Sequence, residues 1–123
     1  MYDINYDRVA GIIRIVVEGF WDVATAESFA ADTNRALLDA RASGRPVLVL
    51  SDARKFAVQS PDVAAVFGRM EEMQGRLRDR MAMAVGSMLT RMQGERAVAG
   101  STTRFFATPE DAEAWLLGKD GAP

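Results

Sequence analysis

The chain has 123 residues, of which 49% are hydrophobic and 26% are charged. This length accommodates one domain with one hydrophobic core, and the composition is that of a folded domain rather than a disordered chain. Cysteine and histidine are absent, which removes disulfides, thiol nucleophiles, imidazole bases and the commonest zinc ligands. The formal net charge is -2 with the signs interspersed, so the chain lacks the basic field that nucleic-acid binding requires.

The beginning of the sequence and the length of its apolar runs predict a cytoplasmic protein. Residues 2–5 carry neither the basic charge nor the apolar centre of a signal peptide. The longest apolar runs, such as residues 47–50, have the length of a strand, whereas a membrane-spanning helix needs roughly 20 apolar residues. We therefore expect neither stable membrane insertion nor nucleic acid as a partner.

Alternating side chains predict two paired strands at the start of the chain. Apolar and polar residues alternate over residues 2–7, and Ile13, Ile15 and Val17 lie on one side of a second run. About four residues separate the two runs, and a connection this short favours a β-hairpin.

Two amphipathic helices are predicted further along the chain. The first runs from its N-cap, Thr25, to about residue 42. The second covers residues 61–77, because Ser60 offers a capping hydroxyl and Pro61 is favoured at the first helical position. Apolar residues recur at three- and four-residue spacing in both, which indicates that one side of each helix lies on a sheet.

Two more helices are predicted in the last third of the chain. Residues 88–98 form the weaker one, because Gly94 interrupts it at a cost of about 1 kcal/mol relative to alanine. The last helix begins at residues 108–111, where a threonine cap, a proline and two acidic residues follow one another, and it ends at Gly118.

Short apolar strands are predicted between these helices, at residues 46–50, 81–85 and 103–106. Residues 47–50 are apolar on both faces, which is typical of a central strand. Strands that alternate with helices favour parallel pairing through right-handed crossovers. The predicted fold class is α/β, with a mainly parallel, mixed five-stranded sheet, helices largely on one face and the element order β-β-α-β-α-β-α-β-α.

Two stretches of the sequence resemble a known family. The segment Gly19-Phe20-Trp21-Asp22-Val23-Ala24-Thr25-Ala26 is similar to the Gly-Glu-Leu-Asp-Leu-Ala-Thr-Ala segment of STAS domains, the fold of bacterial anti-sigma factor antagonists. Residues 105–116 resemble the Phe-x-x-x-x-x-Ala-x-x-Trp-Leu finish of the SpoIIAA-like branch, which is related in shape to CRAL-TRIO lipid-transfer domains. The resemblance implies a single STAS-like domain over residues 1–118, followed by a flexible C-terminal tail at residues 119–123.

The chain departs from this family after the predicted central strand. STAS antagonists carry Asp-Ser-Ser-Gly, with the phosphorylated serine, at the start of the following helix. When Phe56 is matched to the family's loop aromatic, Val58-Gln59-Ser60-Pro61 occupies this position. The resemblance therefore makes Ser60 the candidate phospho-switch residue, while the missing aspartate and glycine argue against control by a kinase.

Residues 51–62 are the expected functional loop, because ligands and partners bind beyond the carboxyl ends of strands in an open α/β sheet. The candidates for binding a partner protein or for a phosphate switch are Ser60, Asp52, Arg54, Lys55, Trp21 and Asp22. Each also has a structural interpretation, since Ser60 would cap the next helix and charged residues keep a loop solvated. Trp21 is either an interface anchor or a side chain that closes the end of the core.

A concentration of methionines indicates a second kind of site. Methionine is flexible and polarizable, so a cluster of methionines can line an adaptable apolar pocket. The candidate pocket residues are Phe67, Met70, Met73 and Met83. Their helical and strand positions favour ordinary core packing over a pocket.

These features predict a non-enzymatic regulatory or protein-binding module that acts through the loop after the central strand. The alternative is a carrier or sensor of a small, lipid-like apolar ligand, and a homodimer is a further expectation. Enzyme activity is not expected, because the adjacent carboxylates Glu71 and Glu72 point in different directions on a helix and cannot act on one substrate. The glycines form no phosphate-binding fingerprint, and the pattern predicts no cofactor, metal site or catalytic residue.

Overall fold

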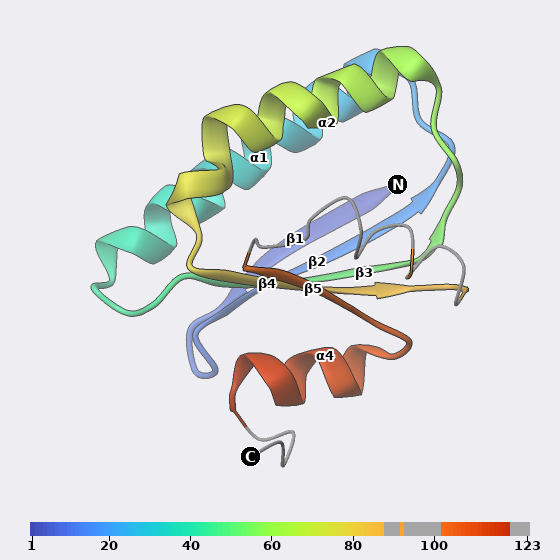
Figure 1. The fold of residues 1–123 in the computed structure, drawn as a ribbon. Helices are drawn as coiled ribbons and strands as arrows, with labels where there is room; N and C mark the ends of the chain where they lie inside the picture. The colour runs from blue at the N-terminus through green and yellow to red at the C-terminus, as the bar shows by residue number, and fades with distance from the viewer. Residues whose placement is uncertain (88–91, 93–101, 119–123) are drawn as a thin grey trace.

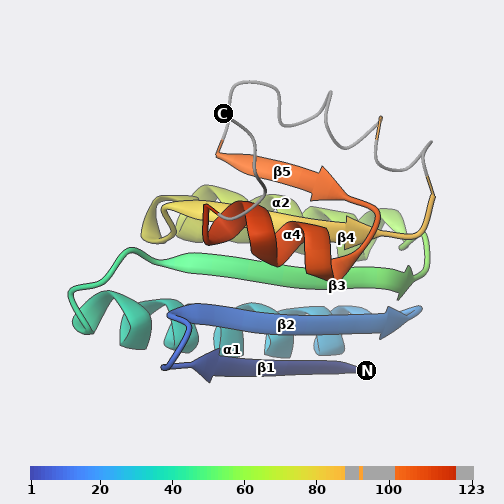
Figure 2. The same ribbon diagram turned by 90° about the horizontal axis from the view of Figure 1, so that it is seen from below.

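The five strands of the protein lie side by side in chain order in one sheet (Figure 2). The computed structural model describes residues 1–87, 92 and 102–118. Its elements are β1 (Tyr2–Asp7), β2 (Ile12–Gly19), α1 (Val23–Ala42), β3 (Leu48–Phe56), α2 (Pro61–Gln74), the 3-10 turn η1 (Gly75–Leu77), β4 (Arg80–Val85), β5 (Thr103–Phe106) and α4 (Pro109–Leu116). The predicted helix at residues 88–98, apart from residue 92, and the predicted tail at 119–123 lie outside the described residues.

β3 occupies the centre of the sheet, as the apolar run at residues 47–50 predicted. β1 and β2 form the predicted antiparallel hairpin, with Tyr2 opposite Val17 and Tyr6 opposite Ile13. The pairs β2–β3, β3–β4 and β4–β5 are all parallel. The predicted α/β class and the mainly parallel, mixed five-stranded sheet are therefore confirmed.

Helices cover both faces of this sheet. α1 and α2 lie together on one face, and α4 lies on the other (Figure 1). The prediction of helices largely on one face is confirmed by α1 and α2, and α4 is the exception. The physical reason lies in the strands, where neighbouring side chains point to opposite faces: Ile12 and Ile13 are both 0% exposed, so each face needs a cover.

Two hydrophobic cores result from this arrangement. The larger core lies between the sheet and the pair α1 and α2, and it includes Ile13, Val49, Phe29, Leu37 and Val63. The smaller core lies under α4, and it includes Ile12, Leu48, Leu50, Ala112 and Leu116. No helix within the described residues has the length and hydropathy needed to cross a membrane.

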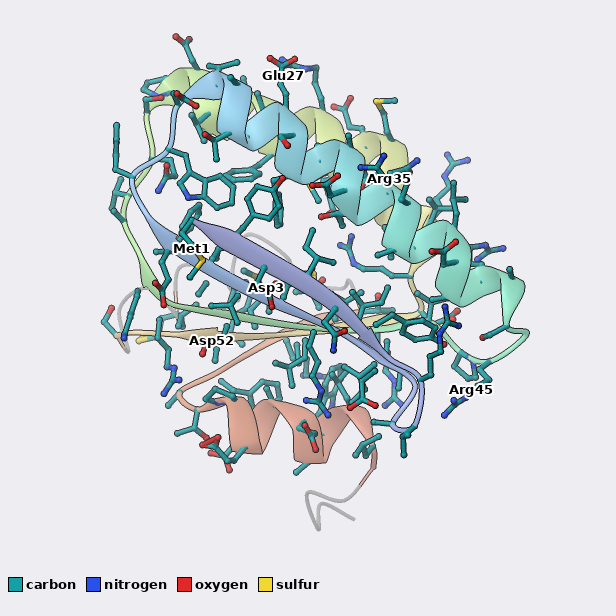
Figure 3. All side chains as sticks on the ribbon, turned by 180° about the vertical axis from the view of Figure 1, so that it is seen from behind. Met1, Asp3, Glu27, Arg35, Arg45 and Asp52 are labelled. Atoms are coloured by element: carbon teal, nitrogen blue, oxygen red, sulfur yellow. The ribbon has the colours of Figure 1, made fainter. Side chains whose placement is uncertain are left out.

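α1 has the amphipathic character that its sequence predicted, although it begins earlier than expected. Glu27 and Arg35 point outward from the helix, away from the sheet (Figure 3). The N-cap is Asp22 rather than Thr25, because the Asp22 Oδ1 atom accepts a hydrogen bond from the Thr25 backbone N at 2.8 Å. Aspartate is the better N-cap of the two residue types, which explains the earlier start.

β3 is longer than its sequence pattern predicted. Ser51 and Ala53 are buried, and the backbone between them pairs with β2 on one side and β4 on the other. The prediction of a loop over residues 51–62 is therefore wrong as far as Phe56, where β3 ends. Only residues 57–60 connect β3 to α2, since pairing with β2 continues to Phe56 and keeps the charged end of β3 extended.

Trp21 lies at the end of the larger core, where five aromatic rings pack together. Its ring centroid is 4.9 Å from that of Phe56 and 5.1 Å from that of Phe29. Tyr2 and Phe67 complete the cluster, with centroids 5.6 Å and 5.9 Å from that of Trp21. The Trp21 side chain is 3% exposed. It therefore closes the end of the core, and the alternative prediction of an exposed interface anchor is wrong.

Replacing Trp21 with alanine should lower the free energy of unfolding by about 3–5 kcal/mol, because deleting a large buried ring leaves a cavity. Urea denaturation followed by circular dichroism measures the loss. Phe20→Ala is the matched control, since this neighbouring ring is 67% exposed, and surface substitutions usually change the free energy by less than about 0.5 kcal/mol. Equal losses in the two variants would contradict the buried position of Trp21.

Candidate functional site

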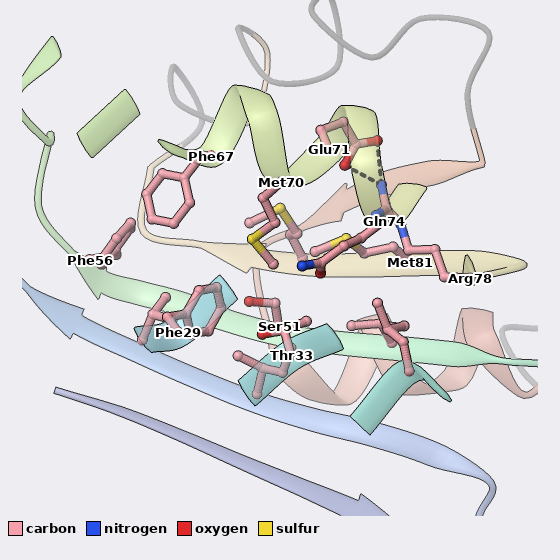
Figure 4. Close-up of a pocket in the computed structure, with 15 residues that line it drawn as sticks. Phe29, Thr33, Ser51, Phe56, Phe67, Met70, Glu71, Gln74, Arg78 and Met81 are labelled. Carbon is pink, nitrogen blue, oxygen red and sulfur yellow. Dashed lines mark hydrogen bonds and ion pairs between the residues drawn. The ribbon is translucent and has the colours of Figure 1, made fainter. Parts of the chain in front are cut away.

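A cavity of about 290 Å³ lies between the sheet and the helices α1 and α2 (Figure 4). Its apolar lining consists of Ile15, Val17, Phe29, Leu37, Val49, Phe56, Phe67, Met70, Met81 and Met83. Its polar lining consists of Thr33, Ser51, Glu71, Gln74 and Arg78. The site is therefore an apolar space with a small polar region, which is the usual composition of a small-molecule pocket.

The structure places the four predicted pocket residues in two groups. Phe67, Met70 and Met83 line the cavity. Met73 does not line it, because its side chain is 79% exposed and borders a groove between α1 and α2. The prediction for Met73 is wrong because the side of α2 that faces the cavity continues from Met70 to Gln74, four residues further along the helix.

Three polar atoms of the lining residues are buried without a hydrogen-bond partner: Thr33 Oγ1, Gln74 Oε1 and Arg78 Nε. Thr33 is 4% exposed and Gln74 is 7% exposed. Within the part of the chain that the structure describes, every buried side-chain atom that lacks a partner belongs to a residue that lines this cavity. The three atoms are themselves enclosed by protein and are not open to the cavity. Leaving such an atom unpaired costs about 1–3 kcal/mol.

Neighbouring contacts hold the polar side chains at the cavity. The Gln74 Nε2 atom donates a hydrogen bond to the backbone oxygen of Ala30 in α1 at 2.8 Å. The Arg78 Nη2 atom donates to both carboxylate oxygens of Glu71, at 2.6 Å and 2.7 Å, as the dashed lines in Figure 4 mark. Gln74 thus joins α2 to α1, and the ion pair balances the charge of Arg78.

The charged candidates at the end of β3 contact each other. The Arg54 guanidinium donates to the two carboxylate oxygens of Asp52, each at 2.9 Å. This hydrogen bonding lowers the pKa of Asp52 and raises the pKa of Arg54. Lys55, the third candidate, is exposed. Asp52 and Arg54 therefore lie at the predicted edge of the sheet as a mutual ion pair.

Gln59, which the sequence analysis did not single out, joins the segments that follow β2 and β3. Its Oε1 atom accepts from the Trp21 backbone N at 2.8 Å, and its Nε2 atom donates to the Gly19 oxygen at 2.9 Å. The segments at residues 20–22 and 57–60 are therefore adjacent. They also present two exposed apolar side chains, Phe20 at 67% and Val58 at 93% exposed.

The remaining two candidates, Ser60 and Asp22, are helix caps. Ser60 Oγ accepts from the Val63 backbone N at 3.3 Å at the start of α2. Asp22 caps α1, and hydrogen bonds from the side chain and backbone of Thr25 lower the pKa of its carboxyl group. Among the described residues, no group of three or more acidic, histidine or cysteine side chains could hold a metal ion.

Comparison with solved structures identifies the architecture. The chain matches an uncharacterized protein of the DUF3478 family from Shewanella loihica PV-4, whose structure has a SpoIIAA-like fold. The TM-score is 0.73 with 18% sequence identity, and the match covers 94% of this chain and 93% of the other. This chain has the SpoIIAA-like fold. No protein-family model matches it, and no match was found among curated proteins.

The SpoIIAA-like fold confirms the resemblance seen in the sequence. The α/β order from β1 to α4 is the architecture that the segments around Trp21 and Trp115 implied. At this level of identity the likeness shows the fold alone, and the matched protein is itself uncharacterized. The function must therefore be argued from the site in this chain.

The pKa of Asp52 should rise toward its ordinary value in an Arg54→Gln variant, because the hydrogen bond from Arg54 is the largest cause that lowers it. Because its pKa is lowered in the folded state, the Asp52 carboxyl group stabilises the protein above the unfolded pKa of about 3.9. This stabilisation is lost as the pH falls through the folded pKa. Carboxyl-carbon NMR titration from pH 7 to pH 2 measures the shift. An unchanged Asp52 titration would contradict the pairing, and Asp22 serves as the internal control.

Thr33→Val should raise the free energy of unfolding of the ligand-free protein by about 1 kcal/mol, because it removes a buried unpaired hydroxyl and keeps the shape of the side chain. Thermal denaturation would record the gain as an increase in Tm of roughly 4 °C. Thr108→Val is the control with the opposite sign, since Thr108 Oγ1 accepts from the Asp111 backbone N at 3.1 Å and caps α4. A loss of stability in both variants would mean that the Thr33 hydroxyl has a partner.

Proposed function

We propose that the protein is a non-enzymatic binding protein for a small, largely apolar molecule, held in the cavity between the sheet and the helices α1 and α2. The observation that carries this proposal is a cavity of about 290 Å³ with a mainly apolar lining and a small polar region. An apolar lining supplies affinity, and a few placed polar groups orient a ligand.

The size of the cavity suits a small ligand. A water molecule takes about 30 Å³ in the liquid, so the cavity of about 290 Å³ corresponds to about ten such volumes. This value lies near the lower end of the range for ligand pockets, about 300–1,000 Å³, and therefore favours a small ligand.

The composition of the wall supports binding without chemistry. Met70, Met81 and Met83 contribute flexible thioethers, which adapt their shape to an apolar ligand. Ser51 of β3 contributes a hydroxyl group to the lining. No histidine can activate this hydroxyl as a nucleophile, because the chain contains none. The carboxylate of Glu71 is engaged by Arg78, which supports a carrier or sensor in preference to an enzyme.

Two expectations about partners remain predictions. Docking to another protein has one observation in its favour, which is that Phe20 and Val58 are exposed on loops that Gln59 holds together. The burial of Trp21 removes the strongest anchor that the sequence offered for such an interface. Formation of a homodimer likewise remains a prediction, which size-exclusion chromatography with light scattering would decide.

Met70→Ala should weaken binding of a small apolar probe such as butylbenzene by about tenfold, which corresponds to about 1.4 kcal/mol, because it removes part of the cavity wall. Trp21 supplies the readout, since its ring packs against Phe56 and Phe67, which both line the cavity. A Trp115→Phe background removes the only other tryptophan of the chain.

Met73→Ala is the matched control for this titration, because Met73 has the same side chain, lies on the same helix and is 79% exposed. It should leave the affinity unchanged. Native mass spectrometry of freshly purified protein should also show a bound small molecule. A clean ligand-free mass, together with no fluorescence response to any apolar probe, would sink the proposed function.

A further inference from the structure

We infer that the cavity takes a ligand with a carboxylate head group, which replaces Glu71 as the partner of Arg78. This inference rests on the proposed binding function and names the chemical class of the ligand. It follows from the unequal burial of the two side chains of this ion pair, from the one donor atom of Arg78 that remains open, and from the apolar lining beside them.

The two members of the ion pair differ in their contact with water. The Arg78 side chain is 11% exposed, whereas that of Glu71 is 62% exposed. Among the lining residues that the structure describes, these two carry charge, and Figure 4 shows the pair on the α2 side of the cavity. An arginine side chain stays charged in proteins. Arg78 is therefore a nearly buried cation whose counterion lies mostly in water.

One donor atom of Arg78 is open. Nε is enclosed by protein, and Nη2 donates to the two carboxylate oxygens of Glu71 at 2.6 Å and 2.7 Å. Nη1 has no hydrogen-bond partner among the described residues, and it is not one of the enclosed atoms. A guanidinium binds a carboxylate best through two parallel N–H groups. An incoming carboxylate can therefore bind Nη1 and take over Nη2 when Glu71 turns away.

Arg78 is held in place more firmly than Glu71. The residue after Arg78 is tied to the start of β3, because Asp79 Oδ2 accepts from the Val47 backbone N at 2.7 Å and the Asp79 backbone N donates to the Val47 oxygen at 2.8 Å. Glu71 reaches Arg78 with an exposed side chain from the last turn of α2. An exposed carboxylate gains little from an ion pair, whereas a nearly buried cation without a partner is strongly destabilising. Glu71 is therefore the member that can be exchanged.

The exchange keeps the cavity electrically neutral. Folding has already removed most of the water around Arg78, so the ligand's carboxylate is the group that loses its hydration, and Glu71 regains hydration when it is released. Charge-assisted hydrogen bonds are roughly twice as strong as neutral ones. A neutral head group cannot displace Glu71, because Arg78 would then lack a counterion, and an ammonium group would face a cation.

The apolar lining sets the rest of the ligand. The rings of Phe29 and Phe67 and the thioethers of Met70 and Met83 surround the space beside the ion pair. The cavity of about 290 Å³ corresponds to about ten water volumes, so the whole ligand has about ten non-hydrogen atoms. The ligand class is therefore a monocarboxylate with a short aliphatic or aromatic tail.

Octanoate, octanamide and butylbenzene test this inference, because they have equal numbers of non-hydrogen atoms and differ in the head group. Calorimetry at pH 7, with Trp21 fluorescence in the Trp115→Phe background, measures the three affinities. Octanoate should bind at least about tenfold more tightly than octanamide, because it alone supplies the negative charge that replaces Glu71.

Variants at the two ends of the ion pair should have opposite effects. Glu71→Gln should increase the preference for octanoate over octanamide by about threefold or more, because it removes the carboxylate that competes for Arg78. Arg78→Gln should decrease that preference by about tenfold or more. Glu72→Gln is the matched control, since this neighbouring residue is exposed, lies outside the lining and undergoes the same change of charge. It should leave the preference unchanged.

The outcomes separate the inference from the proposed function. Octanamide binding as tightly as octanoate would overturn the inference, as would a Glu71→Gln variant whose octanoate preference is unchanged, lower, or no higher than that of Glu72→Gln. If Arg78→Gln does not fold, Glu71→Gln still decides, because its side chain is mostly exposed. Binding of butylbenzene without octanoate would also overturn the inference while supporting an apolar-ligand carrier. Failure of all three probes to bind would overturn the proposed function itself.

Discussion

Burial of both faces of β3 is the constraint on which the rest of the structure depends. Val47 and Val49 face the larger core, and Leu48 and Leu50 face the smaller one. Fully burying a side chain of this size contributes about 1.5–3 kcal/mol, so neither face can be left exposed to water. The chain therefore places α1 and α2 on one face and α4 on the other. The same parallel strands bring the segments after β2 and β3 to one end of the sheet, where Gln59 joins them.

The helices pack less closely on one face of the sheet than on the other, and the cavity lies on the less closely packed face, beneath α1 and α2. Under α4, the small residues Ala82 and Ala112 are both 0% exposed, which indicates close contact between helix and sheet. On the opposite face, the ring cluster around Trp21 fills one end of the space beneath α1 and α2. Beside that cluster, whose rings Phe29, Phe56 and Phe67 form part of the lining, about 290 Å³ is left unfilled next to Met70, Met81 and Met83. Rigid rings and flexible thioethers therefore share the wall of the cavity.

Most of the fold was predictable, because the spacing of apolar residues and the capping residues of helices are local properties of the sequence. The continuous apolar run before Ser51 predicted the centre of the sheet, and the sequence Ser60-Pro61 predicted the start of α2, as the structure bears out. The end of β3 was not predictable in the same way, because its charged residues look like a loop until pairing with β2 and β4 is known. The position of α4 also required tertiary information, since nothing local in that helix specifies the face of the sheet that it covers.

The cavity was only half predictable from the sequence. A search by hydrophobicity finds Phe67, Met70 and Met83, but it prefers Met73 to Gln74, because a polar residue is expected to face solvent. Burying Gln74 and Thr33 beside an apolar cavity costs stability unless their atoms find partners. Gln74 is nevertheless held inward by the hydrogen bond from its Nε2 atom to the Ala30 oxygen of α1. A contact between two helices, which no local sequence pattern reveals, therefore decides which side of α2 faces the cavity.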